Sequence, residues 1–315
     1  MQLYKSRDFS SFFQDTFAFL KLNGKHYFKH FFIVNGFFLL ILMVIGYFIM
    51  EFYTDFLFGG ILQGGNSNTV VDDYLNENAG ILILLAVIFI TVGLFAGLIS
   101  FSYTAIYLKL YSENGGKNFD SQHIVQVYKQ NIGKLFIFLL CSILLGIPIM
   151  IAIGIGAFIL IITIIGILLT PFLIGAFLLF YNMTLMEYLQ HNRGIWDSFG
   201  YAWTLMTKKF LAAVGSVGLF YLMAYVVQNV IALIPYLFGM ASLFTTINDG
   251  GNPNPQEVGG TFMVIMLAVF FITFFVGTIL NNITQLNQGI VFYSLKEENE
   301  NINTKSVIDQ IGSGE

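Results

Sequence analysis

Long apolar runs separated by short polar segments dominate this chain. The first two runs cover Phe31–Met50 and Gly80–Lys109, and no charged residue lies between Lys134 and Glu187. A helix that crosses a bilayer needs about 20 mostly apolar residues. The uncharged stretch would make one helix of about 78 Å at 1.5 Å per residue, which is too long for one crossing. It therefore predicts two spans.

The pattern predicts an all-α, polytopic membrane protein with six transmembrane helices. We expect the third and fourth spans to be joined by a turn near Gly166–Pro171, because Gly and Pro break helices. One integral membrane domain would cover residues 1–298, and residues 299–315 would form a polar, disordered tail. The expected spans are 31–50, 80–109, 135–162, 169–189, 209–237 and 261–293.

Composition agrees with this pattern. Hydrophobic residues make up 57% of the 315 residues and charged residues only 10%, whereas soluble domains carry about 25% charged residues. The basic residues are nearly all Lys, and Ile, Phe and Asn are abundant. Together these features favour an AT-rich bacterial genome, and hence the bacterial inner membrane.

The basic residues predict the orientation of the spans. All 14 Lys and Arg residues fall in the N-terminal segment, in 109–134, in 190–209 or in the C-terminal tail. The other three connections hold acidic residues only. Since Lys and Arg are retained on the cytoplasmic side, we expect both termini to be cytoplasmic.

Three of the basic segments share a pattern of their own. Residues 9–21, 121–131 and 196–206 each place apolar side chains at helical spacing, and each is followed by Lys and a pair of spans. Such helices lie in the membrane interface with their lysines among the phosphates. The sequence thus predicts three interfacial amphipathic helices, each at the start of one of three repeated units.

These segments also carry a family resemblance. Gly194–Phe210 (GIWDSFGYAWTLMTKKF), Gly116–Asp120 (GKNFD) and Tyr128–Asn131 (YKQN) resemble cytoplasmic segments of bacterial six-span proteins. This group includes the membrane domain of some glycerophosphodiester phosphodiesterases and related uncharacterised families. The resemblance implies the six-span architecture. It implies no phosphodiesterase activity, because the soluble catalytic domain is absent, and it transfers no catalytic residue.

Residues able to do chemistry are few. The single Cys141 lies in an apolar run and excludes a disulfide framework. Glu51 and Glu187 fall at span ends, so the spans lack the buried carboxylate of a proton-coupled pump. His26 and His30 are four residues apart but lack the Glu of an HExxH zinc motif. We assign no catalytic residue, no cofactor-binding residue and no metal ligand.

Polar residues inside the spans are the remaining candidates for a site. An amide in hydrocarbon must be hydrogen-bonded, so these side chains should face other helices or a cytoplasm-facing pocket. We expect Asn281 and Gln285 to face the helix bundle and to meet Asn182. The candidate residues of the pocket or interhelical contacts are Asn182, Asn281, Asn282, Gln285 and Gln288.

Three functions remain open on the sequence alone. The first is a non-enzymatic scaffold or accessory component whose partners are membrane lipids and other membrane proteins, without nucleic acid. The second is a transporter of small solutes or lipids that uses the polar pocket. The third is a membrane-embedded metal enzyme that uses the histidines.

Overall fold

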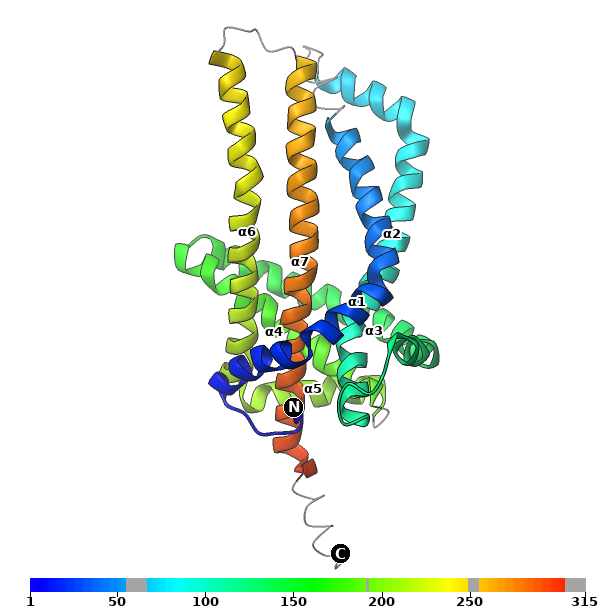
Figure 1. Cartoon of the computed structure of the whole chain (residues 1–315), viewed down its shortest axis with the longest axis vertical. Coiled ribbons are helices and arrows are strands. Elements are labelled where there is room, and N and C mark those ends of the chain that lie inside the picture. Colours follow the sequence, from blue (N-terminus) through cyan, green and yellow to red (C-terminus); the bar gives the residue numbers. More distant parts are fainter. Residues whose placement is uncertain (55–66, 191–192, 249–254, 304–315) are drawn as a thin grey trace, which may run out of the picture. The chain divides into compact units, whose positions relative to one another are not determined.

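A computed structural model describes residues 1–54, 67–190, 193–248 and 255–303 of the chain (Figure 1). Within these residues the backbone is helical and contains no β-strand, which confirms the all-α prediction. The helices are α1 (Phe9–Thr54), α2 (Ser67–Glu113), α3 (Ser121–Ile161), α4 (Ile164–Leu189), α5 (Ile195–Lys208), α6 (Phe210–Asn248) and α7 (Pro255–Glu300).

Six helical segments are long and apolar enough to cross a membrane, as the sequence predicts. Only α5, with 14 residues, is too short to span. The chain is therefore a multi-pass membrane protein in its architecture. The six segments are Phe9–Phe52, Asn78–Glu113, Ser121–Leu160, Leu168–Leu189, Phe210–Leu237 and Gly260–Glu300.

Contacts between residues divide the chain into two compact units. Unit 1 comprises Met1–Asn35, Leu98–Tyr225 and Leu280–Glu315, and unit 2 comprises Gly36–Gly97 and Val226–Ile279. This division coincides with the charge pattern, because all 14 basic residues belong to unit 1 and unit 2 carries acidic residues only. The single membrane domain over residues 1–298 stays a prediction, and residues 304–315 of the expected tail lie outside the described part of the chain.

The turn between α3 and α4 lies at Ile162–Thr163, so the predicted turn near Gly166–Pro171 is placed too late. Thr163 adopts an extended conformation and its hydroxyl accepts a 3.0 Å hydrogen bond from the Gly166 amide. A threonine in this position satisfies one of the free amides at the start of a helix. The helix therefore starts directly after Thr163, and Pro171 lies inside α4.

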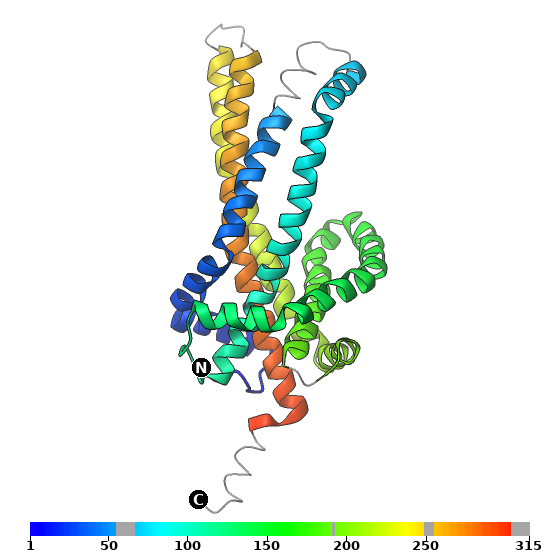
Figure 2. The same ribbon diagram turned by 90° about the vertical axis from the view of Figure 1, so that its right-hand side faces the viewer.

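The three predicted interfacial segments differ in how they join the following span. Only the third is a separate helix, α5, because Lys209 leaves the helical conformation (φ −130°, ψ 49°). The other two are continuous with the rest of α1 and α3. Figures 1 and 2 show that the first half of α1, the start of α3 and all of α5 are directed transversely to the unit 1 part of α7. Their placement in the membrane interface, and the threefold repeat, stay predictions.

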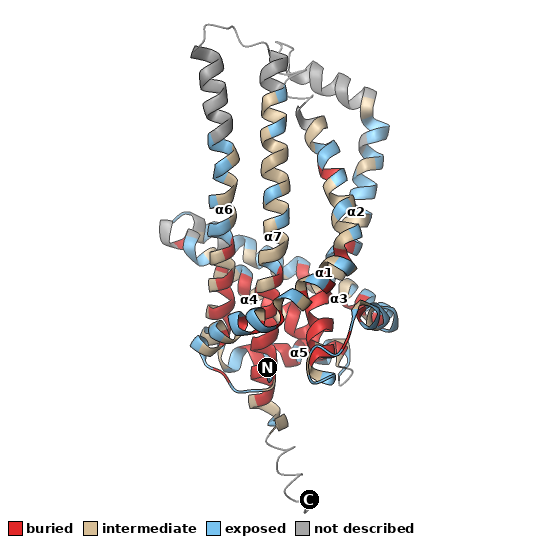
Figure 3. Ribbon diagram, in the orientation of Figure 1, coloured by how far each residue is buried: buried red, intermediate tan, exposed pale blue. Residues whose placement is uncertain are grey.

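Unit 1 holds most of the buried side chains, which Figure 3 marks in red. Its core is rich in aromatic residues, and Tyr27, Tyr103 and Tyr107 of α1 and α2 are completely buried with their rings in edge or tilted contact. In unit 2, the ring of Phe270 from α7 lies directly against the backbone of Gly46 in α1. No larger residue fits there without displacing that ring.

The tryptophans allow the placement of α5 to be tested. Trp196 and Trp203 are the only two in the chain, and both are exposed on α5, at 54% and 58%. Tryptophan favours the bilayer interface. We expect the intrinsic fluorescence of protein reconstituted in brominated phosphatidylcholine to be quenched most by bromines near the headgroup. Equal quenching by all bromine positions, or strongest quenching by bromines at the bilayer centre, would contradict an interfacial α5.

Candidate functional site

Four amide side chains on α7 form what we call the polar layer: Asn282, Gln285, Asn287 and Gln288. All are at most 2% exposed. They follow the long apolar part of α7 and lie within about two helical turns. Burying an amide without a partner is unfavourable, so the packing of unit 1 has to supply hydrogen bonds for each of them.

Helices α1 and α2 supply the partners of the first two amides. The Tyr27 hydroxyl donates to Asn282 Oδ1 at 3.2 Å and shares a 2.6 Å hydrogen bond with the Thr104 hydroxyl. Thr104 also lies 3.1 Å from Gln285 Oε1, to which its hydroxyl can donate. The Tyr103 hydroxyl donates to the backbone carbonyl of Tyr27 at 2.6 Å. These contacts join α1, α2 and α7 through groups that water does not reach.

Asn287 connects α7 to two other helices. Its amide nitrogen donates to the Thr16 hydroxyl of α1 at 3.0 Å and lies 3.1 Å from the Ser216 hydroxyl of α6. The same nitrogen lies 3.3 Å from the backbone carbonyl of Phe12. Thr16 and Ser216 are themselves completely buried. The Asn287 side chain thus bridges α1 and α6. It was not among the candidate residues predicted from the sequence.

Gln288 meets α4 and α6. Its Oε1 accepts a 2.6 Å hydrogen bond from Asn182 Nδ2, and its Nε2 lies 3.5 Å from the Tyr221 hydroxyl. An amide contact between the fourth and sixth spans is therefore present, but not between the expected residues. Asn281 is exposed, so the expectation that it faces the bundle is wrong. Gln285 is buried, but its hydrogen bond is to Thr104 of α2 and not to Asn182.

A buried ionic cluster lies two helical turns further along α7. Lys296 Nζ is 2.6 Å from Glu187 Oε2, and the two side chains are 1% and 0% exposed. Lys296 also donates to Gln190 Oε1 at 2.6 Å, and Arg193 Nε donates to Glu187 Oε1 at 3.0 Å. Glu187 was expected to be solvated at the end of its span. It is instead completely enclosed, with Lys296 of α7 and Arg193 bound to its two carboxylate oxygens.

Tyrosines surround this cluster. The Tyr201 hydroxyl of α5 donates to Glu300 at 2.5 Å, and the Arg193 guanidinium lies 4.1 Å from the centre of the Tyr201 ring. Burial and the hydrogen bond to Glu300 raise the pKa of Tyr201. Burial, together with nearby carboxylates that include Glu187, raises the pKa of Tyr4 to about 12. Both phenols therefore stay protonated at neutral pH, and the Tyr201 hydroxyl keeps the proton that it donates to Glu300.

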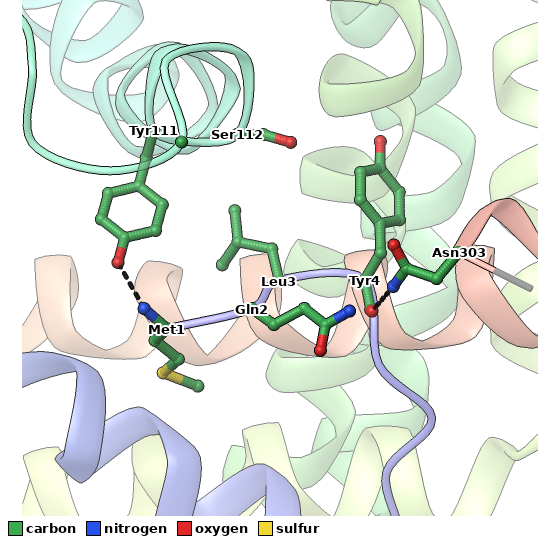
Figure 4. Close-up of a pocket in the computed structure, with 8 residues that line it drawn as sticks. Met1, Gln2, Leu3, Tyr4, Tyr111, Ser112 and Asn303 are labelled. Atoms are coloured by element: carbon green, nitrogen blue, oxygen red, sulfur yellow. Dashed lines mark hydrogen bonds between the residues drawn. The ribbon is translucent and has the colours of Figure 1, made fainter. Parts of the chain in front are cut away.

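The N-terminal segment folds back against this end of unit 1. The Arg7 side chain is buried, donates to the carbonyls of Gln2, Leu3 and Lys5, and forms a 2.7 Å ion pair with Asp15. A cavity of about 360 Å³ lies between this segment and Tyr111 and Ser112 (Figure 4). The residues that line it include no member of the polar layer.

The two histidines of α1 have protein partners. His26 Nδ1 is 2.9 Å from the Tyr107 hydroxyl and its Nε2 is 3.1 Å from the Phe119 carbonyl. His30 Nδ1 is 2.7 Å from the Ser121 hydroxyl. No group of three potential metal ligands occurs in the described part of the chain, and His191 lies outside it. These rings therefore tie α1 to the connection between α2 and α3.

Comparison with known proteins returned no match to a protein-family model, to a curated protein or to a solved structure. The resemblance to the membrane domain of glycerophosphodiester phosphodiesterases stays a prediction. The chemistry of the site rests on its own geometry, in which hydrogen bonds and ion pairs connect α1, α2, α4, α6 and α7 of unit 1.

Proposed function

We propose that this chain is a non-enzymatic scaffold or accessory component of the bacterial inner membrane, with both termini in the cytoplasm. The observation that carries this proposal is that the buried candidate polar residues are hydrogen-bonded to side chains of other helices. Four of the five candidate residues of the site are buried, and each of the four forms a hydrogen bond with another side chain of unit 1. Side chains that bond to one another hold helices together and leave few groups for a substrate.

A transporter with a cytoplasm-facing polar pocket is the second candidate. One observation favours it, since Asn182 Oδ1 is buried and has no hydrogen-bond partner. Buried polar atoms are usually paired, so a bound solute that donates a hydrogen bond would satisfy this oxygen. The Nδ2 atom of the same Asn182 side chain donates to Gln288 Oε1 at 2.6 Å, and this bond supports a structural role for Asn182.

The charges of the two units support the proposed orientation. Unit 1 carries every basic residue, and positively charged segments stay in the cytoplasm. In a Cys141→Ser background, we expect a membrane-impermeant thiol reagent to label Gly65→Cys and Asn252→Cys from outside intact cells. These two sites lie outside the described residues, whereas Gly115 is an exposed residue of unit 1. Labelling of Gly115→Cys from outside would reverse the proposed topology.

The contact between Asn182 and Gln288 separates the two functions. If it is a structural contact, Asn182→Leu and Gln288→Leu should each lower the free energy of unfolding by about 0.6–2 kcal/mol. The double variant should lose less than the sum, because each single change already breaks the shared hydrogen bond. Denaturant unfolding in detergent of the native protein, the two single variants and the double variant measures these free energies.

The exposed Asn281 provides a matched control. Asn281→Leu changes the same type of side chain on the same helix, and should leave stability nearly unchanged because that amide is exposed. Leu variants of Asn182 and Gln288 that are as stable as the native protein would exclude the structural role. If they also lose a copurifying solute, the transporter alternative replaces the scaffold.

A further inference from the structure

Four exposed lysines of unit 1 form what we call the basic stripe: Lys21, Lys25, Lys29 and Lys117. The first three are four residues apart on α1, so they lie on one side of that helix at 3.6 residues per turn. Lys117 comes from the connection between α2 and α3. Its ammonium group donates to the backbone carbonyl of Leu22 at 3.0 Å, which places a fourth positive charge beside the other three.

The two histidines of α1 hold this arrangement in place. His26 bonds to the Phe119 carbonyl and His30 to the Ser121 hydroxyl. These two partners lie two and four residues after Lys117 along the chain. The centroids of the His26 and His30 rings are 4.3 Å apart. The connection that carries Lys117 is therefore fixed against α1 at two points.

No carboxylate neutralises the basic stripe within the part of the chain that the structure describes. Neighbouring acidic side chains have other partners: Asp15 pairs with Arg7 at 2.7 Å, and Asp120 with His123 at 2.7 Å. Asp120 also accepts hydrogen bonds from the backbone amides of Gln122 and His123 at the start of α3. The four ammonium groups thus leave a local excess of positive charge.

Apolar residues continue the same surface. Leu22 is 59% exposed between the lysines, and Ile33, one turn beyond Lys29 on the same side of α1, is 55% exposed. The surface changes from ammonium groups to hydrocarbon within about 6 Å along the helix. A ligand that matches both parts needs a negative headgroup attached to an apolar chain.

We propose that the basic stripe binds the phosphate of an anionic phospholipid, with the start of an acyl chain over Ile33. This inference rests on the membrane architecture and not on the scaffold function. A basic residue near an anionic membrane surface strengthens binding to that surface by about fivefold, so several lysines together should select anionic over zwitterionic lipid. A free phosphate could match the charges but not the apolar continuation.

The test compares two charge-matched variants. Lys21, Lys25 and Lys29 are changed to Gln in one, and Lys5, Lys129 and Lys208, which are also exposed, are changed to Gln in the other. Each protein is reconstituted in nanodiscs of equal phosphatidylglycerol and phosphatidylcholine, and the lipids retained after detergent extraction are identified by native mass spectrometry. We expect the ratio of phosphatidylglycerol to phosphatidylcholine to fall by about 100-fold in the stripe variant, because three such lysines are removed together. The control variant should lose much less of the preference, because its three lysines come from three separate segments of the chain and not from one helix side.

Equal losses in both variants would show a general charge effect and would overturn the proposal, as would an unchanged ratio in the stripe variant. A variant with the three stripe lysines changed to Arg should retain the native preference, because the charges remain. Lys117→Gln should weaken the preference further when added to the stripe variant. Displacement of the retained lipid by millimolar glycerol phosphate would assign the surface to a soluble phosphate instead.

Discussion

The ion pair between Glu187 and Lys296 is the interaction on which the arrangement of unit 1 depends. Both side chains are removed from water, and the loss of hydration is so unfavourable that such a pair forms only with close geometry and further hydrogen bonds. Gln190 and Arg193 supply those further bonds. The end of α4, Gln190 and Arg193 are therefore fixed to one position on α7.

The polar layer extends the same constraint along α7. Lipid tails are as apolar as the helices they surround, so helices in a bilayer associate through packing and hydrogen bonds and not through the hydrophobic effect. Each amide of the layer has a hydrogen-bond partner on a helix other than α7. Gln285 bonds to Thr104 on α2, for example, and Asn287 to Ser216 on α6. Because an unpaired amide would be unfavourable, these contacts select one packing arrangement among many that would bury similar apolar area.

Sequence patterns could predict the parts of this fold that depend on hydropathy and charge over many consecutive residues. Six spans follow from the length of the apolar runs, and the charge pattern coincides with the division between the two units. Details that depend on helix rotation could not be predicted. Adjacent residues of a helix point about 100° apart, so a small error in phase exchanges the exposed Asn281 for the buried Asn282.

The burial of Glu187 shows a second limit. Its position at the end of an apolar run predicts solvation, and only the tertiary packing of α7 and residue Arg193 reveals that the carboxylate is enclosed. Lys296 alone, three residues beyond Tyr293 at the expected end of the sixth span, gives no signal of a buried partner. The turn between α3 and α4 lies earlier than predicted for a local reason, because the Thr163 hydroxyl caps the first turn of α4.

Replacement of the ion pair tests this account most directly. Lys296→Met leaves Glu187 buried without its closest cation and should lower the free energy of unfolding by about 3–5 kcal/mol. Adding Glu187→Met should recover most of that loss, because no uncompensated charge then remains. The comparison is made by denaturant unfolding of the native protein, both single variants and the double variant in the same detergent. If the double variant loses as much as the two singles combined, or if Lys296→Met is as stable as the native protein, the ion pair does not organise unit 1.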